Sequence, residues 1–460
     1  MSLFGILNTG RNGMTAASFG TATASHNASN VATPGFSRRV AHIEPIGSHG
    51  FGGARASGAD RITDPYLERR LLGAHSSAGE ASARATSLSA LDDIFSEAPG
   101  NLGPAFDDFQ TALSDLAVNP GDTAARQLFL SRAGDLSRAF NNAAAGVGTA
   151  IEDTNARITS EVEQLNAKLH EIAKLGAEIA RAETGGQDAG DLHDLRDQHI
   201  REIAQSVPIT VVSDENGAIS VLLSGSQALV SSDNSVHELS TAQDPATGTL
   251  EIYRQSGAGS TRVSGLITGG RIGGYIAARD GTLSETMAQL DALASDVVSA
   301  YNGAHSAGVG LDGGSGRNLF TPVSGADAAR QMSLSADVAG QPDHVAAAID
   351  ASSLPGDNRG ALVLQDLAAT AFADGGTKTA GDALGSIVAS VGVAVQSARA
   401  HESQTGSMVS QVEAVRESIS GVSSDEEMIS LMKFQRSYQA SLRVIEVADQ
   451  MLSDLLNMGR

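Results

Sequence analysis

Apolar residues near the carboxyl end of the chain recur at alternating steps of three and four positions, which is the spacing of one face of an α-helix. Ser424 followed by Glu427 fits a capping box, so the pattern predicts a helix that begins near Asp425. Its apolar stripe would be about 50 Å long and would need a partner, since an isolated helix gains little in water from propensity alone. The stripe consists of Leu431, Phe434, Tyr438, Ile445, Ala448, Leu452 and Leu455, interrupted by polar Ser441 and widened by Leu442, Met451 and Leu456.

The first residues of the chain offer that partner helix. They also place apolar or small residues at steps of four and three, and small residues in a seam allow two helices to approach closely. We therefore expect the two chain ends to form a coiled pair or bundle that carries everything between Pro34 and Ser420. This second stripe consists of Leu3, Leu7, Gly10, Met14, Ala17, Thr21, Ala24, Ala28 and Val31.

A turn is predicted to end the first helix sharply at residues 33–36. Pro34 fixes φ at the second position of this turn, and Gly35 allows a positive φ at the third. Further along, Asp60 to Tyr66 is predicted to be a short exposed connection.

Turn signals divide the middle of the chain into several predicted helices. One runs from Leu67 to Phe95, a second ends at Val118, and a long helix without proline runs from about Thr123 to Ala182. Three glycines offer positions at which the long helix can bend: Gly146, Gly148 and Gly176. Further helices are predicted from Asp191 to Gln205, through Leu283 to Tyr301, and from Leu384 to Ile419.

The apolar period changes after Gln205 to one typical of β-strands. Two runs rich in β-branched and apolar residues, Ile209 to Val212 and Ala218 to Leu223, flank the hairpin signal Asp214-Glu215-Asn216-Gly217. A second pair of runs, Val236 to Thr241 and Thr249 to Tyr253, flanks the turn signal at residues 244–248. The segment from Ser306 to Asp382 is rich in Gly, Ala, Ser and Asp and predicts no definite element.

These elements together predict a mainly α fold. It is a long-helix bundle or coiled coil formed by the N- and C-terminal segments, with a small inserted β-rich unit. The expected divisions are residues 1–60 for an N-terminal axial helix and its loop, 61–206 for a helical body, 207–268 for the β-rich unit, 269–381 for a helix with an irregular outer segment, and 382–460 for the C-terminal axial helices.

Charge and composition narrow the classes of function. The chain has 460 residues and a formal net charge of -22, which argues against nucleic acid or an anionic membrane as a partner. No acidic residue precedes Glu44, so the first 43 residues form a weakly basic tract with little to hold it folded in a lone subunit.

Cysteine is absent, which excludes disulfides, thiolate catalysis and Cys-based metal sites. Without a cleavable signal pattern or an apolar run approaching about 18 residues, these rules alone predict a soluble, cytoplasmic chain.

Three patterns that could indicate nucleotide binding, metal binding or catalysis have simpler structural explanations or are incomplete. Gly308, Gly310 and Gly313 satisfy G-x-G-x-x-G, but the motif follows a helix and precedes no convincing one, so we interpret it as a loop. The acidic and histidine residues from Asp191 to His199 are better explained by ion pairs on a solvated helix face, with Arg196 and Arg201 as partners, than by a metal. No nucleophile elbow surrounds any serine. We therefore expect no catalytic residue, no cofactor and no metal site, and we do not expect an enzyme.

Two runs at opposite ends of the chain resemble the terminal signatures of bacterial flagellar rod, hook and hook-associated proteins. The first extends from Ser25 to Arg38, although His26 and Ala28 stand where Asn and Ile are usual, and the second extends from Met432 to Ser441. The signature residues that we single out are Asn27, Asn30, Thr33, Pro34, Gly35 and Phe36.

Interior segments narrow the resemblance to the flagellar hook-associated protein 1 family, whose members form the first hook-filament junction. They are residues 191–198 before the first hairpin, 273–280, 289–294 and 421–428. The resemblance covers most of the chain. Hook and rod proteins share its two ends but would not carry this long helical middle, so a hook or distal rod subunit is the alternative.

The resemblance implies a structural subunit that joins hook to filament by helical self-assembly of its terminal helices. It implies export through the flagellar type III apparatus without a cleaved signal, and so a secreted, flagellar location. The implied partners are copies of the chain in a ring or helical lattice, the hook protein, the second junction protein and an export chaperone. The assembly residues that we expect are Leu3, Leu7, Met14, Ala17, Leu431, Phe434, Tyr438, Ile445, Leu452 and Leu455.

Overall fold

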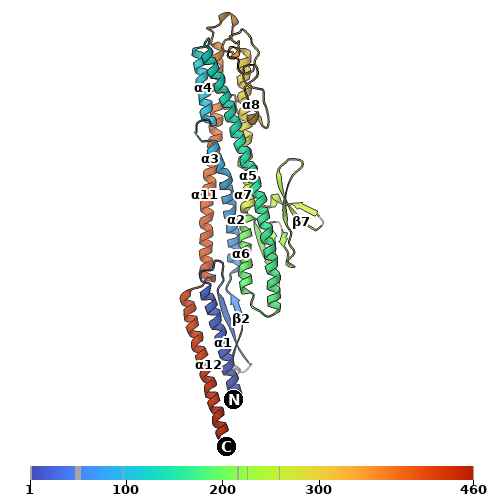
Figure 1. The fold of residues 1–460 in the computed structure, drawn as a ribbon, viewed down its shortest axis with the longest axis vertical. Helices are drawn as coiled ribbons and strands as arrows, with labels where there is room; N and C mark the ends of the chain where they lie inside the picture. The colour runs from blue at the N-terminus through green and yellow to red at the C-terminus, as the bar shows by residue number, and fades with distance from the viewer. Residues whose placement is uncertain are drawn as a thin grey trace. The chain divides into compact units, whose positions relative to one another are not determined.

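The structure is a computed structural model that describes residues 3–46, 53–96, 98–214, 217–224, 226–257 and 259–458. The chain divides into two compact units, each built from separate stretches of sequence. The first unit comprises residues 1–78, 162–270 and 405–460, and the second comprises residues 79–161 and 271–404. Figure 1 shows the helices and strands of both units with their labels.

The first unit is organised around the two terminal helices. Helix α1 (Leu3–Ser29) and helix α12 (Ser424–Met458) lie side by side in antiparallel orientation, with the two chain ends close together (Figure 1). This confirms the predicted pairing of the two ends of the chain. The pairing explains why α1 is helical at all, because its many Gly, Ser, Thr and Asn residues give it little propensity of its own.

A two-stranded hairpin that the apolar pattern did not predict lies against α1. Strands β1 (Arg39–Pro45) and β2 (Ala54–Arg61) pair antiparallel, with Arg39 opposite Arg61 and a register shift between His42 and Ile43. The expected connection from Asp60 to Tyr66 is therefore wrong at both ends, because Asp60 and Arg61 belong to β2 and Pro65 and Tyr66 belong to helix α2 (Pro65–Leu88). Neither strand shows the apolar alternation by which a half-buried strand is recognised.

Helix α6 (Gly190–Ser206) follows the long helix α5 (Thr123–Thr184) and leads into two antiparallel sheets of three strands each. The predicted strands are confirmed with small changes of boundary, except that the run from Val236 becomes a strand only at Leu239. Two further strands, β5 and β8, were missed. The strands are β3 (Ile209–Ser213), β4 (Ile219–Leu223), β5 (Gln227–Val230), β6 (Leu239–Gln243), β7 (Leu250–Ser256) and β8 (Gly259–Arg262).

The first hairpin turn is described only at its edges. Asp214 Oδ1 accepts a hydrogen bond from the backbone N–H of Ala218 at 2.9 Å, as expected for a turn closed by an aspartate. Glu215 and Asn216, which complete the predicted turn signal, lie outside the described residues. After β8 the short helix η1 (Ser264–Leu266) ends the β-rich segment.

The second unit is a helical body. Its helices confirm the predicted order, but the single helix expected from Leu67 to Phe95 is wrong: the chain breaks at Ser89 into two helices. Helix α5 remains one continuous helix through all three of its glycines. The second unit contains α3 (Ala90–Ile94), α4 (Leu102–Val118), the π-helical turn η2 (Arg279–Leu283) and α8 (Ser284–Ala307). It also contains parts of α2 (Pro65–Leu88), α5, α7 (Gly270–Ala278) and α11 (Ala380–Ser420), whose other residues belong to the first unit.

The segment after α8, for which the sequence predicts no definite element, consists of short helices joined by loops. Side-chain hydrogen bonds fix this segment, which has no periodic pattern of apolar residues. The side-chain amide of Asn302 binds both the N–H and the C=O of Phe320, at 2.8 and 2.9 Å. The carboxylate of Asp291 accepts from the N–H groups of Asp327 and Ala329. The short helices are α9 (Ala328–Gln331), η3 (Pro342–His344), η4 (Ala351–Ser353), α10 (Arg359–Asp366) and η5 (Leu367–Ala369).

One stretch within residues 380–458 is long and apolar enough to cross a membrane by length and composition alone. Its most apolar window has a mean hydropathy of 1.3, and a third of that window is buried. Ile387, Val391 and Val395 of this stretch belong to the core of the second unit, which accounts for part of its apolar character.

The core of the second unit centres on Phe109 of α4, which is fully buried. Its ring lies 5.1 Å from that of Tyr301 and 5.4 Å from that of Phe129, within the range of favourable aromatic pairs. The Tyr301 hydroxyl accepts a hydrogen bond from the Gln110 side chain at 2.7 Å, and burial raises the pKa of Tyr301 to about 12. Residues far apart in sequence therefore meet in one cluster.

We expect Phe109→Ala to destabilise the second unit by about 3–5 kcal/mol, because it removes a fully buried ring and leaves a cavity. Tyr66→Ala is the control, since the Tyr66 side chain is 78% exposed, and it should cost less than about 1 kcal/mol. Urea unfolding followed by circular dichroism measures both variants. Equal midpoints for the two would contradict this assignment of the core.

Candidate functional site

The predicted stripe of α12 is the side of that helix that faces α1. Leu431, Phe434, Tyr438, Ile445 and Leu452 are partly covered, and Ala448 is fully buried. Ser441, the polar residue that interrupts the stripe, also lies in this seam and is partly covered. Leu455 is 57% exposed and lies beyond the covered part of the seam.

The matching stripe of α1 lies against it. Ala17 is buried, and Leu3, Leu7 and Met14 are partly covered. Close approaches along the seam follow the antiparallel order: a Cβ at Gly20 would lie 2.5 Å from the ring of Phe434, and one at Gly10 would lie 2.7 Å from Cγ1 of Ile445. Any larger residue at these positions would force the helices apart. The small residues therefore set the distance between the helices.

The signature loop after α1 is a hydrogen-bonded structure rather than a flexible link. The Asn27 side chain is buried, and it binds both the C=O and the N–H of Arg39, at 2.8 and 3.0 Å. Asn27 thereby fixes the start of β1 against the last turn of α1. The Thr33 hydroxyl donates to the Asn30 side chain at 3.1 Å.

The predicted turn at residues 33–36 is confirmed. The N–H of Phe36 donates to the C=O of Thr33 at 3.2 Å, and Gly35 has a φ of +81°. The ring of Phe36 is buried 5.5 Å from that of His26, while Pro34 is exposed. The turn thus brings the chain back over α1 and into β1.

Arg38, just after this turn, connects the amino end of the chain to the carboxyl end. Its backbone N–H donates to the C=O of Ser420 at 2.8 Å, at the end of α11. Its guanidinium binds Glu427 at 2.8 Å and Glu426 at 2.9 Å, in the first turn of α12. Glu427 is only 2% exposed, so Arg38 neutralises a carboxylate that would otherwise be buried without a partner.

The capping box expected of Ser424 and Glu427 is wrong, because α12 is capped one residue earlier. The Ser423 hydroxyl accepts from the N–H of Glu426 at 3.5 Å, and the Ser423 C=O accepts from the N–H of Glu427 at 3.0 Å. Ser423 is therefore the cap in place of Ser424. The carboxylate of Glu427 is not available to the helix terminus because it binds Arg38.

A second ion pair cluster fastens the signature loop to the surrounding helices. Glu68 of α2 binds Arg416 of α11 at 2.9 Å and Arg201 of α6 at 3.1 Å. Arg416 also donates to the C=O of Gly35 at 2.8 Å. One carboxylate thus joins three segments of the first unit to the turn.

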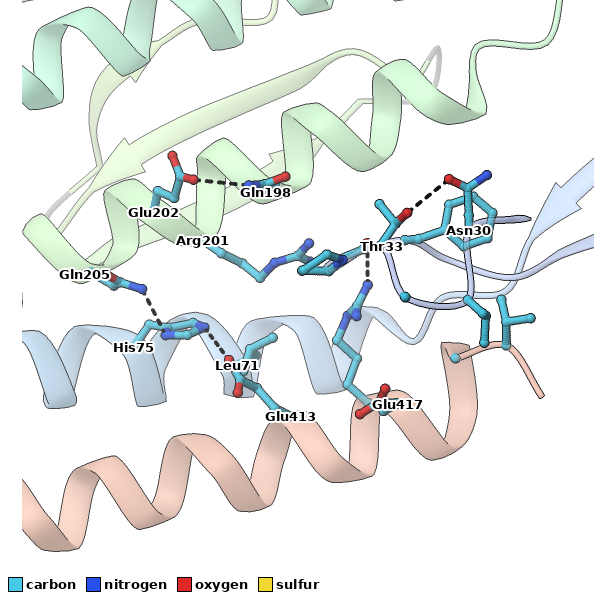
Figure 2. A pocket seen from close by; sticks show the side chains of 18 residues that line it. Asn30, Thr33, Leu71, His75, Gln198, Arg201, Glu202, Gln205, Glu413 and Glu417 are labelled. Atoms are coloured by element: carbon cyan, nitrogen blue, oxygen red, sulfur yellow. Dashed lines mark hydrogen bonds and ion pairs between the residues drawn. The ribbon is translucent and has the colours of Figure 1, made fainter. Parts of the chain in front are cut away.

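Gly35, Arg201 and Arg416 are among the residues that line a cavity of about 570 Å³, which Figure 2 shows from close by. His75 lies on one side of it, 3.5 Å from the Gln205 amide and 3.6 Å from the Glu413 carboxylate, and burial lowers the pKa of His75. The Glu202 carboxylate accepts from the Gln198 amide on the α6 wall. Within the part of the chain that the structure describes, the polar contacts of His75 join helices and include no hydroxyl or thiol that could act as a nucleophile.

The carboxylates of α6 bind mainly arginines of the hairpin, although Arg196 of α6 itself also lies 3.9 Å from Asp197. Arg61 binds Asp194 at 2.6 Å and Asp197 at 2.7 Å, while Arg39 binds Asp191. Burial opposes the charge of Arg61, but the two carboxylates outweigh it and raise the pKa of its guanidinium. The ion-pair interpretation holds, but Arg201 as a partner is wrong because it binds Glu68, and the hairpin that supplies the true partners was not predicted.

The other suspected chemical motifs have structural roles as well. His193 binds Glu183 at 2.9 Å and His199 binds Glu202 at 3.2 Å. Among the described residues no group of three or more His, Asp or Glu side chains is placed to hold a metal ion. The G-x-G-x-x-G run follows α8 as a loop, in which the N–H of Gly313 donates to the C=O of Gly310 at 3.0 Å.

Sequence reasoning missed the residues that join the two ends of the chain, namely Arg38, Arg61, Glu68, Arg416 and Glu427. One signal pointed to them: arginines in a tract with no acidic residue need carboxylates from elsewhere. The pattern alone could not show which carboxylates these are, since Arg38 and Glu427 are 389 positions apart.

Comparisons with known proteins agree with this arrangement. The sequence model described as "Flagellar hook-associated protein FlgK helical domain" matches residues 88–320, and "Flagellar basal body rod FlgEFG protein C-terminal" matches residues 414–458. The chain is 24% identical to "Flagellar hook-associated protein 1" of Escherichia coli (strain K12), over 98% of this chain and 99% of that protein. It is also 24% identical to the protein of the same name in Bacillus subtilis (strain 168), over 99% and 98% of the two chains.

The fold has a relative among solved structures. "The structure of the flagellar hook junction protein FlgK from Burkholderia pseudomallei" aligns with a TM-score of 0.68 and 18% identity, over 76% of this chain and 100% of that one. At that identity the likeness shows the fold alone. The helical-domain match, which spans half of the sequence, shows more: this chain belongs to the flagellar hook-associated protein FlgK family.

Proposed function

We propose that this chain is a structural subunit of the bacterial flagellum that joins hook to filament. The observation that carries the proposal is the pairing of α1 with α12, in a chain whose middle matches the helical domain of hook-associated proteins. In the proposed mechanism, the terminal helices of neighbouring copies pack into a tube wall. One surface of a copy binds a different surface of the next, so an assembly can meet one protein below and another above.

Supporting this role, the seam residues lie along the paired helices and the signature residues lie at their joint. We propose that the seam residues act by holding α1 and α12 as one rod, and that Asn27 and Gly35 act by fixing the loop that returns to β1. The same proposal includes export to the flagellum, the hook protein on one side and the second junction protein on the other. It also includes an export chaperone, since the apolar residues that α1 leaves uncovered on α12 invite aggregation.

A hook or distal rod subunit is the second candidate. The match of residues 414–458 to a rod-protein carboxyl end favours it, because that segment is shared among rod and hook proteins. The match of residues 88–320 and the nearly complete alignment with two hook-associated proteins favour the junction. The two candidates predict different structures in a cell that lacks the gene.

Deletion of the gene should leave hooks without filaments and flagellin shed into the medium, because filament subunits would have no junction on which to assemble. Electron microscopy of the cells and an immunoblot of the medium measure this. Loss of the hooks themselves would instead assign the chain to the hook or rod, and unchanged flagella would contradict a junction role.

Ile445→Pro should abolish assembly while the second unit stays folded, because proline in a helix interior removes a hydrogen bond and costs about 3 kcal/mol or more. Ser424→Pro is the matched control: it places the same residue at the first position of the same helix, where proline is tolerated. Complementation of the deletion strain, scored by filament number, measures both variants. If Ile445→Pro restores filaments as well as Ser424→Pro does, the paired terminal helices are not the assembling element.

Arg38→Ala should loosen the joint between the two ends, because it leaves the buried Glu427 carboxylate without its partner. Since Arg38 is itself partly exposed, we expect a local cost of about 1.5–3 kcal/mol. Hydrogen exchange should become faster in residues 30–38 and in the first turns of α12. Arg11→Ala, at an exposed site on α1, is the control and should leave these rates unchanged.

A further inference from the structure

Residues 345–348 lie in the interior of the second unit, and every one of them is buried. We call them the inner segment. They follow the short helix η3 and belong to the stretch for which the sequence predicts no definite element. Since the inner segment reads Val-Ala-Ala-Ala, its side chains supply little apolar surface to hold it. Hydrogen bonds from other parts of the chain to its backbone fix its place instead.

Two of these hydrogen bonds join backbone to backbone. The C=O of Ala347 accepts from the N–H of Ala361 in α10 at 2.9 Å, and the C=O of Ala348 accepts from the N–H of Val309 at 2.7 Å. The packing leaves no room for a side chain at Gly360, where a Cβ would lie 2.7 Å from the carbonyl oxygen of Ala348. The loop after α8 and the start of α10 therefore depend on the position of the inner segment.

Two buried side chains bind the inner segment as well. The Arg126 guanidinium, from α5, donates to the C=O of Val345 at 2.7 Å. The N–H of Ala346 donates to Nε2 of His305, near the end of α8, at 3.0 Å. Arg126 and His305 are both 0% exposed, so water cannot replace either bond while the inner segment stays in place.

The hydrogen bonds of His305 define its protonation state. Its Nδ1 lies 2.8 Å from the C=O of Arg317, and because a carbonyl only accepts, Nδ1 carries a hydrogen. Its Nε2 accepts from the N–H of Ala346, so Nε2 carries none. His305 is therefore neutral. A protonated ring would have a hydrogen on both nitrogens, and the N–H of Ala346 would then face a second donor.

The charged groups of the surrounding elements are largely satisfied by other partners. Asp312 binds Arg317, and the Asp337 carboxylate accepts from the N–H of Asn318 at 3.1 Å. Among the described residues no carboxylate forms an ion pair with His305. The titratable groups nearby are Arg126 of α5, Tyr301 of α8, Asp312 and Arg317 of the loop after α8, Asp337, Asp343 and His344 before the inner segment, and the paired Asp357 and Arg359 at the start of α10.

A proton on His305 is therefore unfavourable in the folded second unit. Burial lowers the pKa of His305, and the charge of Arg317 lowers it further, while the hydrogen bond to the Arg317 C=O and the charge of Asp337 do not outweigh burial. The proton would also add a cation beside Arg126, whose Nη2 is buried without a hydrogen-bond partner. Like charges repel more strongly in a buried site than in water.

We propose that His305 is an acid-sensitive latch on the inner segment. While the ring is neutral, Nε2 accepts from Ala346 and holds the inner segment against α8. When Nε2 takes up a proton it can no longer accept, and the inner segment opens together with the loop after α8 and the start of α10. The latch belongs to the second unit alone and does not depend on the proposed role in a flagellum.

Falling pH favours the open state. In an opened chain His305 has the ordinary histidine pKa of about 6.5, and the closed site lowers this pKa, so the open state binds the proton more readily. The closed state is therefore most stable above about pH 6.5 and loses stability as the pH falls below that value. For one proton, the equilibrium constant for opening rises by up to about tenfold per pH unit.

Hydrogen exchange of the purified full chain between about pH 7.5 and about pH 5, corrected for intrinsic exchange rates, tests the latch. In the wild type, the opening constant at the amides of Val309, Ala346 and Ala361 should rise toward about tenfold per pH unit below about pH 6.5. In His305→Gln, whose side chain donates and accepts but takes up no proton, this constant should not change with pH. His344→Gln is the matched control and should keep the wild-type slope, because the His344 ring binds the C=O of Asp337 instead of the inner segment.

Equal protection of the Ala346 amide across this pH range in the wild type would overturn the latch, and so would a wild-type slope in His305→Gln. If His305→Gln fails to fold, the ring nitrogen chemical shifts of the wild-type chain decide. One histidine should stay neutral below about pH 6.5 and become protonated where the Ala346 amide loses protection. Titration of all 11 histidines near the ordinary value, with that amide still protected, would rule out the latch.

Discussion

The close contact between α1 and α12 is the interaction on which the first unit depends. It requires the missing side chains of Gly10 and Gly20, since a Cβ at either site would collide with Ile445 or Phe434. Helix α1 could not compensate for a wider separation, because its sequence supplies few large apolar groups and little helix propensity. The order of the amino end of the chain is thus a consequence of contact with the carboxyl end.

Ion pairs join the two ends of the chain in addition to the helix seam. The first 43 residues contain no acidic group, and the structure places Arg38 and Arg39 of this tract and Arg61 of β2 against carboxylates from distant segments. Arg38 binds Glu426 and Glu427, and Arg39 binds Asp188 and Asp191. An uneven charge distribution that looks unfavourable in the sequence is balanced only when both ends of the chain are folded together. The joint and the seam therefore stabilise the same arrangement by independent means.

The parts of this fold that could be predicted from the sequence are those with local causes. The stripes of α1, α5 and α12 follow from apolar spacing, and the turn at Gly35 follows from its own residue types. The β1–β2 hairpin could not be found, because it exists by contact with α1 and with the α6 carboxylates rather than by its own alternation. The helix cap shows the same limit: Ser423 and Ser424 are both followed by a glutamate three positions later, and the distant Arg38 binds both glutamates, so spacing alone does not show which serine caps the helix.

Helix α12 buries one side in the seam and leaves apolar residues exposed elsewhere, which bears on assembly. Its seam holds the first unit together, whereas Val447, Met451, Leu455 and Leu456 remain exposed. A net charge of -22 makes copies repel one another at long range, so an assembly contact must bury apolar surface where that repulsion is weakest. Helix α1, without a single acidic residue, is such a place. Two features of the amino end therefore have separate reasons. Its small residues allow close packing within the subunit, and its lack of acidic residues keeps the charge low at a surface that a neighbour can approach.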